Sequence, residues 1–158
     1  MIFVSKQKNQ VIQNNDSNNV QSNDMNSTKT DQKPKAKPPK PEDKPFKQFI
    51  EEELIPALTQ SLNKLGCPPN NIILQNGDRP VSGGKCWMVI GEISKYRRFW
   101  LCFDTDNITS NKTIAIAEDG SQPSILESFL IDEKKTTKAL LVSRLMQRLN
   151  GQKWLGAN

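Results

Sequence analysis

Residues 86–103 of the chain read CWMVIGEISKYRRFWLCF, and this stretch decides the fold. Its two ends, residues 86–93 and 99–103, are rich in aromatic and β-branched residues, which is typical of β-strands. The connection 94–98 is short, so we expect the two strands to pair as an antiparallel hairpin. Apolar residues alternate onto both faces of the first strand, which favours a central strand covered at least partly on both sides.

A long helix is predicted before this hairpin. Apolar residues recur at three- and four-residue spacing from Phe46 to Leu65, which indicates a helix with one face on a core. Asp43 is the predicted N-cap, and Gly66 supplies the C-terminal stop. Pro56 lies inside the apolar stripe, so we expect it to kink or divide the helix.

The remaining elements flank the hairpin on both sides. Residues 72–75 and 113–117 are predicted strands. A Ser-x-x-Glu capping pattern at residues 124–127 predicts a short helix to Leu130, and a longer helix is expected from an Asp132 cap to near Asn150, stopped by Gly151. The predicted class is α+β: a two-layer sandwich in which a four-stranded antiparallel meander is flanked by an N-terminal and a C-terminal helix.

The first 41 residues differ in composition from the rest of the 158-residue chain. They hold seven Lys against three Asp, are rich in Asn, Gln and Ser, and end in alternating Pro and Lys. Such a segment buries too little apolar surface to offset its ordering entropy, so we expect residues 1–41 to be a disordered tail. Residues 42–158 hold 15 Lys and Arg against 14 Asp and Glu, and we expect them to form a single, nearly neutral domain.

The chain contains no histidine, which excludes Ser-His and Cys-His nucleophile pairs, His-ligated metals and imidazole acid–base catalysis. Its glycines form no phosphate-binding loop that leads into a helix. We therefore expect no enzyme, cofactor or metal site. No stretch approaches the ~20 apolar residues of a membrane span, and no signal or transit peptide is recognisable, so we expect a cytoplasmic protein.

Three cysteines, Cys67, Cys86 and Cys102, are an odd number in a chain without a recognisable secretory signal. We expect them to be reduced and buried as small apolar groups. A redox pair between Cys86 and Cys102 is the alternative, because both residues fall in strands that could be neighbours.

The most informative surface feature is a run of cations around one aromatic ring between the two strongest strands, namely Lys95, Tyr96, Arg97 and Arg98. A tight connection projects such side chains together at the end of a sheet, where they can bind an acidic partner, a phosphate or RNA. A merely solvated hairpin tip is the alternative. Lys153 and Trp154 follow the last predicted helix; the indole either anchors a partner or, as we expect, folds back onto the core.

Two C-terminal stretches resemble a known family. They are residues 127–134, ESFLIDEK, and residues 147–155, QRLNGQKWL; the opening DKPF at residues 43–46 and the pair Cys86-Trp87 are also similar. The resemblance is to a small cyanobacterial and plastid family that we associate with the V subunit of the photosynthetic complex-I-like NAD(P)H dehydrogenase. It covers residues 42–155, the whole predicted domain.

This resemblance implies a non-catalytic, peripheral accessory subunit on the cytoplasmic face of the thylakoid membrane. Such a subunit would stabilise the hydrophilic arm of the ferredoxin–plastoquinone oxidoreductase and assist the docking of ferredoxin, an acidic electron carrier, in cyclic electron flow. Its partners would be subunits of that arm and ferredoxin itself. The alternative function is binding of RNA or anionic lipid through the basic tip and the tail, although the nearly neutral domain makes nucleic acid the less favoured partner.

Overall fold

The structure is a computed structural model, and it describes residues 37–155. Most of the predicted tail, residues 1–36, lies outside the described residues. The first element of the described chain is a short 3₁₀ helix, η1 (Pro41–Asp43). The Lys40 N–H donates to the Asp43 carboxylate at 2.9 Å across this turn.

A continuous helical segment follows and consists of α1 (Phe46–Gln48), the π-helical turn η2 (Phe49–Leu54) and α2 (Ile55–Lys64). At the end of η2 the Ile55 N–H donates to the Ile50 carbonyl, five residues back. Pro56 has no N–H to donate, and its ring crowds the carbonyl four residues earlier. A wider turn before Pro56 relieves this crowding, so the irregularity predicted at Pro56 takes the form of a π turn within an unbroken helix.

Five strands form one antiparallel meander, in which neighbours along the chain are neighbours in the sheet. They are β1 (Asn71–Asp78), β2 (Lys85–Ser94), β3 (Arg97–Phe103), β4 (Lys112–Ala117) and β5 (Leu126–Phe129). The predicted hairpin is confirmed, since β2 pairs with β3 in a register that places Val89 opposite Leu101. The α+β class is also confirmed, but the sheet has five strands and not the predicted four.

The fifth strand replaces the short helix that we predicted over residues 124–130, so that prediction is wrong. An extended strand directs alternate side chains to opposite faces of the sheet, where each finds a partner that a helix of one or two turns would not provide. Phe129 is buried in the main core, Glu127 pairs with Arg148 of the C-terminal helix, and Leu126 packs on the opposite face of the sheet. Pairing with β4 also supplies partners for the backbone of the segment. The capping pattern is therefore overridden by tertiary packing.

The C-terminal helix, α3 (Lys138–Gly151), starts later than predicted. Its N-cap is Thr137 and not Asp132: the Thr137 hydroxyl accepts the Leu140 N–H at 3.2 Å. The Glu42 carboxylate accepts the Lys138 N–H at 2.7 Å. These two acceptors satisfy N–H groups that the first turn of a helix leaves free. None of the described helices has the length and apolar character needed to cross a membrane.

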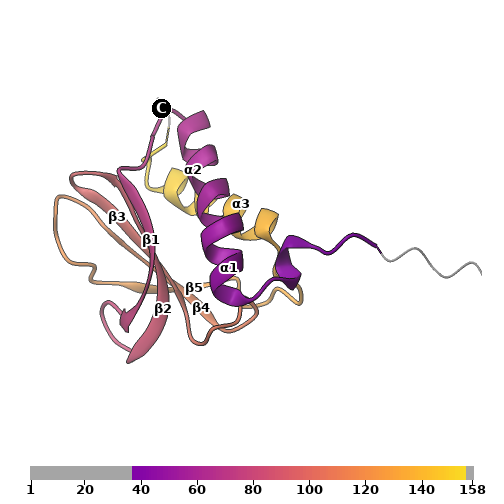
Figure 1. Ribbon diagram of the computed structural model, residues 1–158. Helices are drawn as coiled ribbons and strands as arrows, with labels where there is room; N and C mark the ends of the chain where they lie inside the picture. The colour runs from indigo at the N-terminus through magenta and orange to yellow at the C-terminus, as the bar shows by residue number, and fades with distance from the viewer. Residues whose placement is uncertain (1–36, 156–158) are drawn as a thin grey trace, which may run out of the picture. The chain divides into compact units, whose positions relative to one another are not determined.

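The helices all lie on one side of the sheet, so the described domain has two layers (Figure 1). The main core fills the space between them and includes Phe49, Leu58, Phe99, Leu101 and Leu145, all fully buried. A smaller buried cluster lies on the other face of the sheet and consists of Cys86, Met88, Trp100, Cys102, Ala115 and Ala117. The central strands are therefore buried on both faces, as their sequence indicates.

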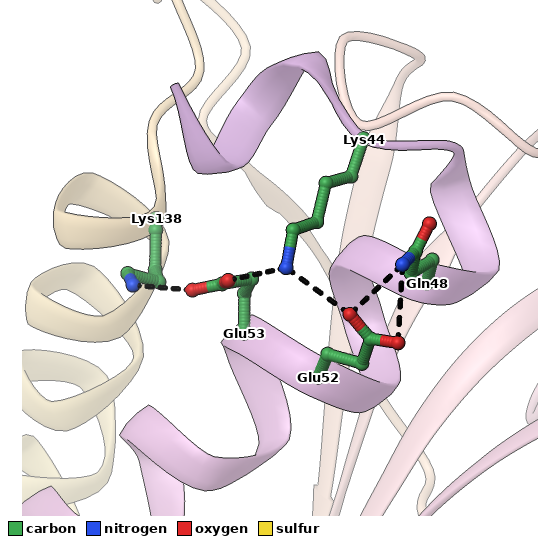
Figure 2. A network of polar contacts seen from close by, with 5 residues as sticks. All are labelled: Lys44, Gln48, Glu52, Glu53 and Lys138. Atoms are coloured by element: carbon green, nitrogen blue, oxygen red, sulfur yellow. Dashed lines mark hydrogen bonds and ion pairs between the residues drawn. The ribbon is translucent and has the colours of Figure 1, made fainter. Parts of the chain in front are cut away.

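A network of polar contacts joins the N-terminal helical segment to α3 (Figure 2). The Lys138 ammonium lies 2.7 Å from one oxygen of Glu53, and the Lys44 ammonium lies 2.7 Å from the other. Lys44 also contacts Glu52 at 3.1 Å, and Gln48 donates to both oxygens of Glu52. These contacts, Lys138 first and Lys44 second, lower the pKa of the Glu53 carboxyl to about 2. Glu53 thus links the two helices through a pair of cations.

Candidate partner-binding site

The predicted basic tip lies in the β2–β3 connection, but its four residues do not form one patch. Lys95 and Tyr96 form the turn, whereas Arg97 and Arg98 are the first two residues of β3. Successive side chains of a strand point to opposite faces, so the two arginines separate. Arg97 contacts Trp154 of the main core, and Arg98 contacts Trp100 on the other face.

Trp154 folds back onto the core, as expected from the sequence, and is 2% exposed. Its indole N–H donates to the Glu118 carboxylate. The Arg97 guanidinium lies 5.9 Å from the centroid of the indole ring and donates to the Trp154 carbonyl at 3.5 Å. The Cys67 thiol donates to the same carbonyl at 3.1 Å. The two predicted stretches are therefore brought together, but Trp154 is buried and Arg97 is half-buried against it.

The turn that returns Trp154 to the core depends on a residue that the sequence did not single out for this role. Lys153 has φ +58°, and its N–H donates to the Asn150 carbonyl at 2.8 Å. The Trp154 N–H donates to the Leu149 carbonyl at 3.3 Å. This is the Schellman pattern, with a lysine at the left-handed position that glycine usually occupies. The predicted stop at Gly151 is two residues early, since Gly151 is the last helical residue.

The exposed part of the predicted site consists of Lys95, Tyr96, Arg98 and Lys153. Lys95 and Lys153 are exposed, Arg98 is half-buried, and the Tyr96 ring is 52% exposed with the Lys95 ammonium 5.4 Å from its centroid. The Arg98 guanidinium lies 5.1 Å from the Trp100 ring and donates to the Ser121 carbonyl at 3.3 Å. Glu92 is opposite Arg98 in the β2–β3 register, so one carboxylate lies within the group. Lys95 beside the exposed Tyr96 ring is the part of this arrangement that suits recognition of an acidic surface, whereas Arg98 lies against Trp100.

A groove lies between β5 and α3, and the sequence predicted no role for it. This groove has a volume of about 440 Å³, and nine of its ten lining residues come from the two stretches that carry the family resemblance, 127–134 and 147–155. The tenth is Arg144. The resemblance alone marked both stretches, but it could not show that they meet, because their contact depends on the unpredicted strand β5.

Charged pairs join α3 to β5 and to the segment that follows β5. The Arg148 guanidinium donates two hydrogen bonds to the Glu127 carboxylate, at 2.8 Å from Nε and 2.5 Å from Nη2. This pairing lowers the pKa of the Glu127 carboxyl and raises the pKa of the Arg148 guanidinium. Arg144 is held more loosely, with Glu133 at 3.7 Å and the Gln147 side-chain oxygen at 3.0 Å.

Cys86 and Cys102 lie on the same face of neighbouring strands, and both are free and buried. Burial is the main cause that raises the pKa of the Cys102 thiol to about 12, and the nearby Cys86 adds to it. A thiol with so high a pKa is almost wholly protonated at neutral pH and is a weak nucleophile. These properties fit the expectation of reduced, buried thiols for this pair, whereas Cys67 is only half-buried; the redox pair remains a hypothesis.

A family model described as "Protein of unknown function (DUF2996)" matches residues 40–156. The matched range contains both the tip and the groove. No curated protein matches the chain.

Proposed function

Since the chain belongs to the DUF2996 family, whose description assigns no function, we propose one from the surface described above. The protein is a non-catalytic accessory subunit that binds an acidic protein partner through Lys95, Tyr96, Arg98 and Lys153. The resemblance of the two C-terminal stretches points to the host: the photosynthetic NAD(P)H dehydrogenase-like complex, on the cytoplasmic face of the thylakoid membrane. In that setting ferredoxin is the acidic partner that the tip would help to dock, and the complex is what the subunit would stabilise.

One observation carries this proposal: the Lys95 ammonium lies beside the exposed Tyr96 ring at the turn, while the neighbouring Arg97 is half-buried against Trp154. The anchor matters because it fixes the start of β3, and so the place from which Arg98 and the turn residues project. Aromatic side chains and arginine are enriched in protein interfaces. Lysine is depleted there, so the lysines of the tip contribute through charge complementarity. Contacts between exposed opposite charges speed association more than they strengthen it, and they weaken as salt rises.

The test is binding of ferredoxin, and of the isolated complex, to a variant that carries Lys95→Ala, Arg98→Ala and Lys153→Ala. A matched control carries Lys64→Ala, Lys134→Ala and Lys135→Ala, which removes the same charge from exposed positions outside the tip. Arg97 is left intact because its loss would disturb the core. We expect the tip variant to associate more slowly at low ionic strength, with a difference that shrinks as salt is added. Equal association rates for the tip variant and the control at the lowest salt would contradict the proposal.

The same cations could bind a phosphate backbone, and the exposed Tyr96 ring could stack on a base or lie at a lipid surface. RNA and vesicles that contain anionic lipid are therefore further arms of the same measurement. Tip-dependent, salt-sensitive retention on either of them, without binding to ferredoxin or to the complex, would favour this second function.

A further inference from the structure

The strand β5 is an edge of the sheet. The strand order ends with it, and no strand in the described part of the chain pairs with its outer side. In an antiparallel ladder, alternate residues of an edge strand direct their N–H and C=O groups away from the sheet. Natural edges are commonly protected by Lys, Pro, a bulge or a very short strand; β5 is short, with four residues, but it contains neither Lys nor Pro, its Glu127 is paired with Arg148, and its register with β4 is regular. The outer backbone of β5 is thus a template for another strand.

The groove lies beside this edge and has an apolar floor. Phe129 and Leu130 line it, and Leu130 has φ +53°, which ends the extended strand. Ile131 follows at the rim and is 70% exposed, more than any other large hydrophobic side chain in the described residues. The volume of about 440 Å³ is within the roughly 300–1,000 Å³ of typical ligand-binding clefts.

The helix side of the groove offers one cation to a ligand. Arg148 is occupied by the two hydrogen bonds to Glu127. Arg144 has only the contact with Glu133 at 3.7 Å as an ion pair, and both side chains are well exposed, at 47% and 38%. Exposed pairs of this kind are weak. A carboxylate from a ligand can therefore compete with Glu133 for Arg144, but it must approach past Asp132, which also lines the groove.

We propose that an extended segment of a protein partner binds in this groove and adds to β5 as a sixth strand. Its backbone pairs with the outer groups of β5, and side chains at alternate positions face α3. Apolar side chains at those positions cover Leu130 and Ile131, and a carboxylate near one end reaches Arg144. The site uses none of the tip residues, so this inference and the proposed function succeed or fail separately.

The test begins with a phage-displayed library of random linear octapeptides, selected on the full-length protein. We expect enriched peptides in which apolar residues alternate with polar ones and an Asp or Glu is present. Synthetic copies should lose roughly tenfold or more in affinity with Ile131→Lys and with Arg144→Glu. The matched control is Ile125→Lys, the same change at a side chain that is 66% exposed and lies outside the groove. Bound peptide should also slow amide hydrogen exchange of residues 126–129.

Three results would overturn the inference. The first is a library that yields no enriched sequence. The second is a set of peptides that bind Ile131→Lys and Arg144→Glu as well as they bind the parent, or that protect amides elsewhere. The third is a concentration-dependent dimer of the chain that Ile131→Lys abolishes, because the groove would then hold a second copy of this protein. If Ile131→Lys lowers the melting temperature, Arg144→Glu decides alone.

Discussion

Gly91 lies in β2 directly opposite Phe99 of β3, and the Phe99 ring occupies the space where a side chain at residue 91 would stand. A Cβ added at Gly91 would lie 2.1 Å from Cε1 and 2.3 Å from Cζ of that ring, whereas ordinary contacts are 3.4–4 Å. The φ of Gly91 is not in the left-handed region, so the backbone tolerates alanine and the penalty of Gly91→Ala is purely steric. Phe99 is fully buried, so the ring must move by more than 1 Å within a closed core.

Overpacking of this kind costs about 1–3 kcal/mol. For a chain of this length each kcal/mol corresponds to roughly 4 °C, so Gly91→Ala should melt about 4–12 °C below the parent. The assay is thermal unfolding followed by circular dichroism, with the free energy of unfolding taken from urea titration. The control is Gly151→Ala, the same substitution in the last turn of α3 where an added Cβ meets nothing within 4 Å. That control should be neutral or slightly more stable, because alanine favours a helix.

A double variant identifies the clash as the cause. Phe99→Leu removes the far edge of the ring and by itself costs stability through the cavity it leaves. If a clash with the Phe99 ring is the cause, Gly91→Ala should cost at least about 1 kcal/mol less when it is added to Phe99→Leu than when it is added to the parent. A Gly91→Ala protein that melts within a degree of the parent, or costs that simply add, would refute the reasoning.

Three further predictions follow from single contacts. The pKa of Glu53 is lowered from 4.5 to about 2, so the stability that it provides is present above pH 4.5 and lost as the pH falls towards 2. Glu53→Gln should therefore be less stable than the parent at neutral pH, and its free energy of unfolding should fall less steeply across that acid range. Lys153→Gly should raise the free energy of unfolding by about 1 kcal/mol in urea titration, since glycine adopts φ +58° without strain. Arg97→Ala should lower it by about 1–2 kcal/mol through loss of the contact with Trp154, whereas Lys95→Ala should leave the thermal melt unchanged.

The elements that sequence predicted best are those whose pattern is long and internally consistent. The helix before Gly66 and the β2–β3 hairpin each have a clear period. The helix ends as predicted before Gly66, but it begins at Phe46 after Pro45, so the predicted Asp43 N-cap is wrong. The segment 124–130 combines conflicting preferences: a capping pattern favours a helix, and alternation around Glu127 and Phe129 favours a strand. The conflict is resolved by partners far along the chain, namely β4 and Arg148, which a local pattern does not contain.

The candidate site shows the same limit. The sequence placed three cations at one tip, yet strand alternation sends Arg97 inward and Arg98 to the other face. The sequence does not predict this separation of the two arginines, because the start of β3 depends on the bulge that shifts the β2–β3 register near Glu92 and Ser94. The groove could not be predicted from the sequence for a different reason. Its two walls are separated along the chain, and only the pairing of β5 with β4 brings them together.

The two surfaces share one support, which is the stretch 147–155. Its first part, with Gln147 and Arg148, lines the groove, and its last part returns Trp154 to the core beside Arg97. The left-handed turn at Lys153 joins these parts, so a change in that turn shifts both surfaces at once. Variants that alter the backbone of this turn therefore report on neither surface alone. Ile131→Lys for the groove and the triple variant at the tip separate them, since Ile131 lies before α3 and the alanine at Lys153 keeps its backbone pattern. Loss of ferredoxin binding in the first variant, or of peptide binding in the second, would show that the two surfaces act as one.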